Sequence, residues 1–113
     1  MRHVVDASPL SEPVFFILAS LAAEAKHGYA LMKDIERLSG QRVRLSTGTM
    51  YGALRRLLDE DWITRIQTED TSREKQTYQI TQAGMEALEA EHARLKQLTK
   101  ITSSLLRTRE VSL

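Results

Sequence analysis

The chain has 113 residues, a length typical of one small domain, and its core is too small to enclose a large active site. It contains no cysteine, which excludes disulfides, thiolate catalysis and cysteine zinc sites and fits an intracellular, reducing location. Because 16 Lys and Arg residues nearly balance 15 Asp and Glu residues, any polyanionic partner must be bound by a local cluster of basic residues.

The N-terminal part predicts an arm and a buried helix. Residues 1–10 are expected to form a flexible arm, and Ser11 with Pro13 favours a helix start, because proline needs no amide partner there. The helix should run to about Ala25 as the central core helix, since apolar residues cover most of its circumference. Its longest apolar run falls far short of the roughly 20 residues that a membrane span needs, and no secretory signal precedes it. We therefore predict a cytoplasmic protein without a membrane partner.

Two amphipathic helices are expected next. After Gly28, apolar residues spaced three or four apart predict a helix that ends at Ser39 and Gly40. Ser46 is a suitable N-cap for a third helix. The core face of that helix is predicted to carry Met50, Ala53, Leu54, Leu57 and Leu58.

The opposite face of the third helix has an unusual composition. A projection at about 100° per residue places on it Gly48, Thr49, Tyr51, Gly52, Arg55 and Arg56. An interior glycine costs about 0.8 to 1.0 kcal/mol relative to alanine, and close approach to the major groove of DNA would account for this cost. Residues 42–57 also hold four arginines and no acidic residue. The alternative is structural: the glycines relax or pack the helix, and the arginines only solvate it.

Two short strands are predicted after the third helix. Ile63 to Thr68 and Gln76 to Ile80 are rich in residues that favour strands, and they should form a hairpin that packs on the first and third helices. The tip of the hairpin carries Arg73 and Lys75, which could reach a minor groove or its phosphates. The alternative is that this charged tip is only solvated.

Thr81 favours the start of a long last helix, from about Gln82 to Arg109. At about 1.5 Å per residue, this helix is roughly 40 Å long and projects beyond its own small domain. Its apolar stripe would then lack a partner, so we predict that it dimerises. The residues predicted at the dimer interface are Leu88, Leu95, Leu98, Ile101 and Leu105.

Three helices, a hairpin and a last helix follow each other in the order of a winged helix-turn-helix domain. We therefore predict a mostly α-helical chain with a small β-hairpin. It is divided into the arm (1–10), a winged helix-turn-helix DNA-binding domain (11–81) and a C-terminal dimerisation helix (82–113). The residues predicted to contact DNA are Arg44, Ser46, Thr47, Gly48, Thr49, Tyr51, Gly52, Arg55, Arg56, Arg73 and Lys75.

No residue pattern indicates catalysis, a metal site or a cofactor. The sequence has no glycine-rich phosphate loop and no nucleophile beside a base, and its three histidines lack a second ligand at metal-binding spacing. Tyr29 and Tyr78 are expected in the core, and Trp62 is expected to pack between the third helix and the first strand, with ligand stacking as its alternative. We therefore predict a protein that is not an enzyme.

Three segments resemble the PadR family of bacterial transcriptional regulators. They are HGY at residues 27–29, LSTGTMY at residues 45–51 and YQITQAG at residues 78–84. The resemblance, which covers roughly Leu10 to Leu88, implies binding of operator DNA as a dimer and commonly a repressor released by a small ligand or stress signal. The family often has proline at the positions of Thr47 and Gly52, a second aromatic residue at that of Thr77, and more glycine and arginine in the wing than residues 69–75 contain.

Two functions follow from these observations. The first is a dimeric regulator that binds double-stranded operator DNA, with a possible small-molecule effector. The alternative is a winged-helix module that binds another protein through the glycine-rich face without binding DNA. The dependence of binding affinity on salt concentration distinguishes the two functions, because phosphate contacts make the affinity fall steeply as the salt concentration rises.

Overall fold

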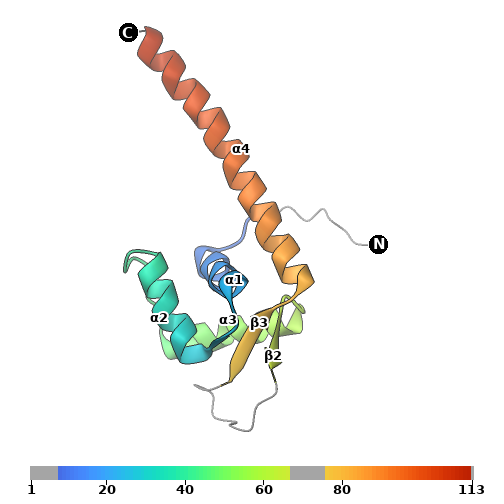
Figure 1. Cartoon of the computed structure of the whole chain (residues 1–113). Helices are drawn as coiled ribbons and strands as arrows, with labels where there is room; N and C mark the ends of the chain where they lie inside the picture. The colour runs from blue at the N-terminus through green and yellow to red at the C-terminus, as the bar shows by residue number, and fades with distance from the viewer. Residues whose placement is uncertain (1–7, 67–75, 113) are drawn as a thin grey trace.

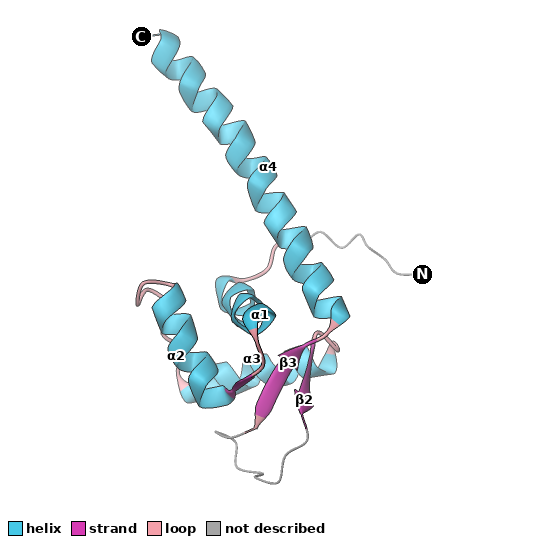
Figure 2. Ribbon diagram, viewed as in Figure 1, coloured by secondary structure: helices cyan, strands magenta, loops and turns pink. Residues whose placement is uncertain are grey.

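The computed structural model describes residues 8–66 and 76–112, in which there are four α-helices and three short strands (Figure 1). The elements in chain order are α1 (Glu12–Ala23), β1 (Lys26–His27), α2 (Gly28–Leu38), α3 (Thr47–Asp59), β2 (Ile63–Ile66), β3 (Thr77–Ile80) and α4 (Gln82–Ser112). Figure 2 shows the sheet at one side of α1 and α3, with α4 extending away from the rest. This is the winged helix-turn-helix arrangement that the sequence predicts.

Side-chain caps fix the starts of three helices. In each case the side-chain oxygen accepts a hydrogen bond from the backbone N–H three residues later: Ser11 (3.3 Å), Ser46 (3.2 Å) and Thr81 (3.0 Å). Such caps satisfy backbone donors that have no partner within the helix. The three helix starts predicted from these residues are therefore confirmed.

Two predicted helix ends were wrong by a few residues. Helix α1 ends at Ala23 instead of about Ala25, because Glu24 is already extended (φ −173°, ψ 159°) and leads directly into β1. Helix α4 continues to Ser112 instead of ending at Arg109. Neither difference moves a residue between faces of its helix.

The core lies between α1 and the elements around it. Helix α1 contacts α2, α4 and β3, and its Ile17 and Leu18 have no exposed surface. Helix α2 contributes Leu31 and Ile35. The buried residues of α3 are Met50, Ala53, Leu54 and Leu57. The central position predicted for the first helix is confirmed.

The sheet has three antiparallel strands in the order β1-β3-β2, so the prediction of a hairpin alone was incomplete. Strand β1 forms part of the sheet because its Lys26 pairs with Tyr78 of β3. A side-chain contact supports this pairing, since Nδ1 of His27 lies 2.9 Å from Oγ1 of Thr77. A strand of two residues is too short to show the period-two pattern that reveals strands in a sequence. The predicted packing of the hairpin is confirmed, since β3 contacts α1 and β2 contacts α3.

The tyrosines and the tryptophan occupy different environments. Tyr78 is buried and Trp62 packs against the core, as predicted, but Tyr29 is 54% exposed. The prediction for Tyr29 was wrong because two helical positions, about 200°, separate it from the buried Leu31. Its ring instead lies 5.6 Å from Nζ of Lys33, near enough for a cation–π contact.

Two glycines allow close approach between elements. A Cβ atom at Gly28 would overlap the hydroxyl group of Tyr51, and one at Gly84 would overlap the backbone carbonyl oxygen of Trp62. That carbonyl also accepts a hydrogen bond from the backbone N–H of Thr81 (3.0 Å), which holds it in place. Gly84 therefore lets the first turn of α4 lie against the connection between α3 and β2.

Substitution of Gly84 by alanine is expected to destabilise the fold by about 1 to 3 kcal/mol, as overpacked substitutions usually do. The matched control is Gly52→Ala in α3, where a Cβ would meet no atom within 4 Å. This control should stabilise the fold by up to about 1 kcal/mol, because alanine is the better helix former. Urea unfolding measures both changes, and a Gly84→Ala variant as stable as the parent would contradict the packing described above.

Candidate nucleic-acid interface

Helix α3 presents an exposed face of small and basic side chains, which we call the α3 face. Its members are Thr47, Gly48, Thr49, Gly52, Arg55 and Arg56, all of them exposed. A Cβ atom would have open space at both Gly48 and Gly52. The projection from the sequence is therefore confirmed for five of these residues, Thr47 being exposed at the start of the helix without having been projected there, and neither glycine is required for packing within the chain.

Tyr51 does not belong to the α3 face, so its predicted position was wrong. The side chain is half-buried and packs against the core, with its hydroxyl group against Gly28. Tyr51 follows the buried Met50 by about 100° around the helix, which puts it on the flank between the two faces. A long aromatic side chain at such a position can lie back over the core.

The connection from α2 to α3 makes the turn of the helix-turn-helix. Gly40 (φ 64°) and Gln41 (φ 68°) both adopt the left-handed conformation there. Oγ of Ser39 then accepts a hydrogen bond from the backbone N–H of Val43 (2.9 Å). These contacts fix the chain that leads into Ser46 and the start of α3.

The four arginines of this region differ in their partners. Arg42 forms an ion pair with Glu12 (2.7 Å), and Arg44 donates a hydrogen bond to the amide oxygen of Gln41 (3.2 Å). Within residues 8–66 and 76–112, no carboxylate pairs with Arg55 or Arg56. Positive charge on the α3 face is thus left available for an external anion.

A cleft of about 270 Å³ lies between part of α3 and the sheet. We call it the α3–β2 cleft, and its lining residues are Tyr51, Leu54, Arg55, Leu58, Arg65 and Tyr78. Arg65 is a residue that the sequence analysis did not select. The predicted wing residues Arg73 and Lys75 lie outside the described residues, so their contact with DNA remains a prediction.

Helix α4 carries an apolar stripe beyond the domain. Its large apolar side chains are all exposed: Leu95 38%, Leu98 47%, Ile101 47%, Leu105 64% and Leu106 56%. Leu88, by contrast, is partly buried and packs against the core of its own chain, and its place in a dimer interface stays a prediction. It lies in the part of α4 that the domain still covers. We call the exposed part, from Leu95 to Leu106, the α4 stripe.

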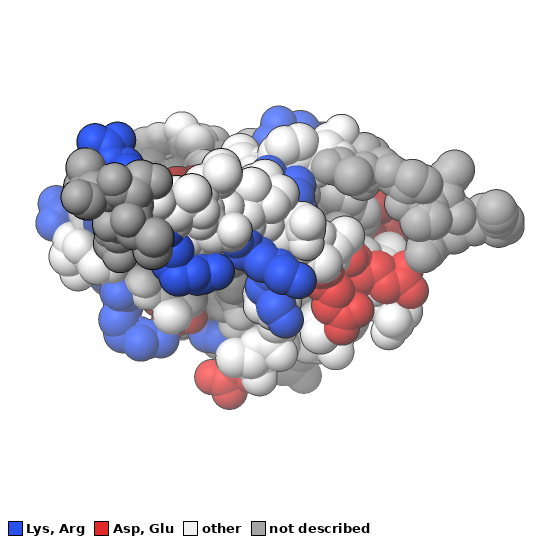
Figure 3. Space-filling view, turned by 90° about the horizontal axis from the view of Figure 1, so that it is seen from above, with Lys and Arg blue, Asp and Glu red and all other residues white. Residues whose placement is uncertain are grey.

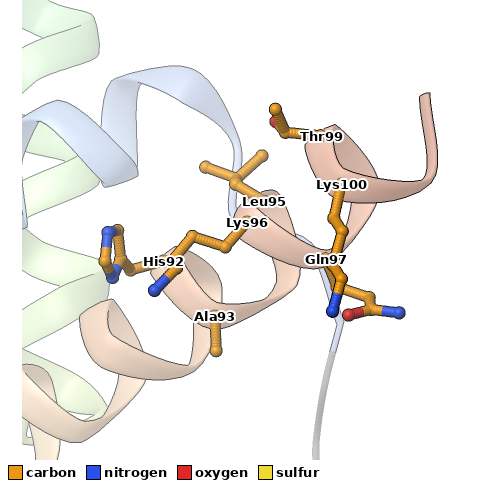
Figure 4. A pocket seen from close by; sticks show the side chains of 7 residues that line it. All are labelled: His92, Ala93, Leu95, Lys96, Gln97, Thr99 and Lys100. Atoms are coloured by element: carbon orange, nitrogen blue, oxygen red, sulfur yellow. The ribbon is translucent and has the colours of Figure 1, made fainter. Parts of the chain in front are cut away.

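A hollow of about 650 Å³ lies beside the middle of α4 (Figure 4). All of its lining residues come from α4 itself: His92, Ala93, Leu95, Lys96, Gln97, Thr99 and Lys100. A single helix cannot enclose a ligand, so this hollow is open to solvent in one chain.

A buried ion pair marks the place where α4 leaves the domain. Glu91 is only 6% exposed, and Arg94 binds its carboxylate through Nε (2.8 Å) and Nη2 (2.7 Å). These hydrogen bonds, together with one from the backbone of Leu10, outweigh burial and lower the pKa of Glu91. Leu10 also packs against the core, so the end of the predicted arm is held against α4.

The charge pattern seen from the α4 end of the molecule is mixed. Figure 3, viewed from the α4 end, shows basic side chains across the middle and left of that face and acidic side chains gathered to the right.

Among the described residues, no three His, Asp or Glu side chains lie close enough to hold a metal ion. No helix in the described ranges is both long and apolar enough to cross a bilayer.

Comparison with known proteins gives a consistent result. The model of the transcriptional regulator PadR-like family matches residues 17–90 of this chain. The chain is also 35% identical over 83 residues to an uncharacterised 37.1 kDa protein in transposon TN4556 of Streptomyces fradiae, and it spans only 23% of that protein's length. The match therefore carries no information on the function of the remaining part of that larger protein.

Two solved structures share the fold. A PadR family transcription regulator from Clostridium difficile superposes with a TM-score of 0.69 at 21% identity, over 85% of this chain and 99% of the other. PadR from Bacillus subtilis, solved in complex with operator DNA, superposes with a TM-score of 0.60 at 26% identity, over 73% of this chain and 47% of the other. The α-helical winged fold is thus shared with proteins of this kind.

Proposed function

The chain belongs to the PadR-like family of transcriptional regulators, which are not enzymes, and we propose that it binds operator DNA sequence-specifically as a dimer and acts as a repressor. The observation that carries this proposal is the α3 face. Two glycines there have open space above them, and the neighbouring Arg55 and Arg56 have no carboxylate partner in the described ranges. The operator complex of the 26% identical Bacillus subtilis PadR supports the choice of ligand.

The α3 face has the chemistry that a major groove requires. Gly48 and Gly52 let the helix backbone come close to base edges, while threonine hydroxyls and guanidinium groups supply hydrogen-bond donors. Arg44 and Ser46 lie beside the start of α3, whose free N–H groups favour a phosphate. Tyr51 takes part only through the α3–β2 cleft, and Arg73 and Lys75 remain candidates for wing contacts.

The α4 stripe supports the dimer. Each leucine or isoleucine left in water forgoes up to about 1.5 to 3 kcal/mol of burial, so a second copy of α4 is the partner that would cover the stripe. A two-fold dimer presents two α3 helices, which suits a palindromic operator with half-sites about 34 to 36 Å apart.

Release by an effector is part of the proposal, because the resemblance to the family implies it. A cleft of about 160 Å³ lies beside Trp62, between the N-terminal segment and α4, and Glu91 lines it. A small ligand there would contact both the domain and the helix that carries the dimer stripe. A cytoplasmic location fits this role.

The alternative, a protein-binding module, has less support. Protein interfaces are anchored by buried aromatic and other large apolar side chains. The α3 face is made of threonine, glycine and arginine, and no large apolar side chain is among its six members. These residue types fit a polyanion better than a protein surface.

Loss of Arg55 tests the DNA contact directly. After an operator has been selected from fragments of the host genome, Arg55→Ala should weaken its binding by about 1 to 3 kcal/mol, as expected when one base or phosphate contact is lost. Arg107→Ala is the matched control, because Arg107 is exposed on α4. Equal affinity of the Arg55 variant and the control, both folded and dimeric, would contradict the proposed role of the α3 face.

Gly52→Ala separates stability from binding. This variant is expected to be at least as stable as the parent because its Cβ has open space, yet to bind the operator more weakly because the Cβ separates α3 from the groove. A fluorescence titration beside a urea unfolding curve measures both properties. A variant that gains stability and keeps the parent's affinity would mean that α3 does not approach DNA at this point.

A further inference from the structure

Arg65 occupies an unusual place in strand β2. Side chains alternate along a strand, so Arg65 lies on the same face of β2 as Ile63, which is 1% exposed in the core. In the register of the sheet, Arg65 stands opposite the buried Tyr78 of β3. The core-facing side of the sheet therefore ends in an exposed guanidinium group, where an apolar residue would continue the pattern.

The position of Arg65 brings it to the cleft that α3 borders from the other side. Arg65 of β2 and Arg55 of α3 both line the α3–β2 cleft. Within the described ranges, neither arginine has a carboxylate partner. Two like charges beside one cleft repel each other, so this arrangement does not serve the stability of the free protein. It does suit an anion that both arginines could bind.

We propose that the α3–β2 cleft binds one backbone phosphate of the DNA strand, held between Arg55 and Arg65. The inference rests on the proposed function, in which α3 enters the major groove and the hairpin lies against the neighbouring minor groove. A sugar–phosphate strand separates any major groove from the next minor groove. That strand must therefore cross the gap between α3 and β2, where the two arginines lie.

The walls of the cleft strengthen such a contact. Leu54 and Leu58 of α3 and the ring of Tyr78 keep part of the space apolar. A charge-assisted hydrogen bond between guanidinium and phosphate is stronger where water is partly excluded. Arg65 would thereby fix the position of the domain on the duplex without reading sequence, which is the usual role of phosphate contacts.

Salt dependence of binding tests the site, because each phosphate contact contributes about 0.9 to the slope of log affinity against log salt. The probe is a duplex of random sequence, and the variants are Arg65→Gln, which keeps most of the side chain, and Arg65→Lys, which keeps the charge. We expect Arg65→Gln to reduce the slope by about 0.9 and Arg65→Lys to retain it. Arg107→Gln is the control, since Arg107 lies on the side of α4 opposite Leu98 at about 100° per residue.

A second comparison asks whether Arg55 and Arg65 share one phosphate. If they do, the double variant Arg55→Gln/Arg65→Gln loses less of the slope than the sum of the two single variants, because the contacts act as a unit. Strictly additive losses would overturn the shared site. A slope of Arg65→Gln equal to that of the Arg107→Gln control, in a chain that binds DNA, would overturn this inference alone. Failure of the parent chain to bind DNA would overturn the proposed function as well.

Discussion

One side of α4 packs against the domain in its first half and carries exposed leucines in its second half, and the arrangement of the molecule depends on this constraint. Gly84, Glu91, Leu98 and Leu105 are spaced seven residues apart and therefore share one side of the helix, apart from a drift of about 20° per heptad. The first two face the domain, whereas the leucines lie beyond it and are exposed. Because the helix is continuous, whatever covers Leu98 and Leu105 also sets the position of the domain and of α3.

The junction between these two surfaces is polar but fully paired. Glu91 is buried at the point where α4 leaves the domain, and Arg94 satisfies both carboxylate oxygens. A buried carboxylate without such a partner would be costly. Arg94 lies on α4 itself, so the hydrogen bond from the backbone of Leu10 to Glu91 is the contact that links α4 to the N-terminal segment. In the proposed dimer, this junction would pass the orientation of the α4 stripe on to the α3 face.

The sequence predicts most of the fold because local rules govern it. Caps at Ser11, Ser46 and Thr81 and apolar periodicity suffice for the helices and for the open face of α3. The errors concern residues whose surroundings come from elsewhere in the chain. Strand β1 exists only because β3 runs beside it. Tyr51 lies on the flank of its helix and turns toward Gly28. The place of Arg65 is visible only once α3 and β2 face each other across a cleft.

The central claim is that the α4 stripe joins two copies of the chain, and sedimentation at micromolar concentration tests it most directly. The parent chain and Leu98→Glu are compared with Gln97→Glu, which introduces the same side chain at an exposed position about 100° around the helix from Leu98. The account predicts a dimer for the parent and for Gln97→Glu, and a folded monomer for Leu98→Glu, because a charge in the stripe would be buried without a partner. A monomeric parent, or a Leu98→Glu variant that remains as dimeric as the parent, would contradict it.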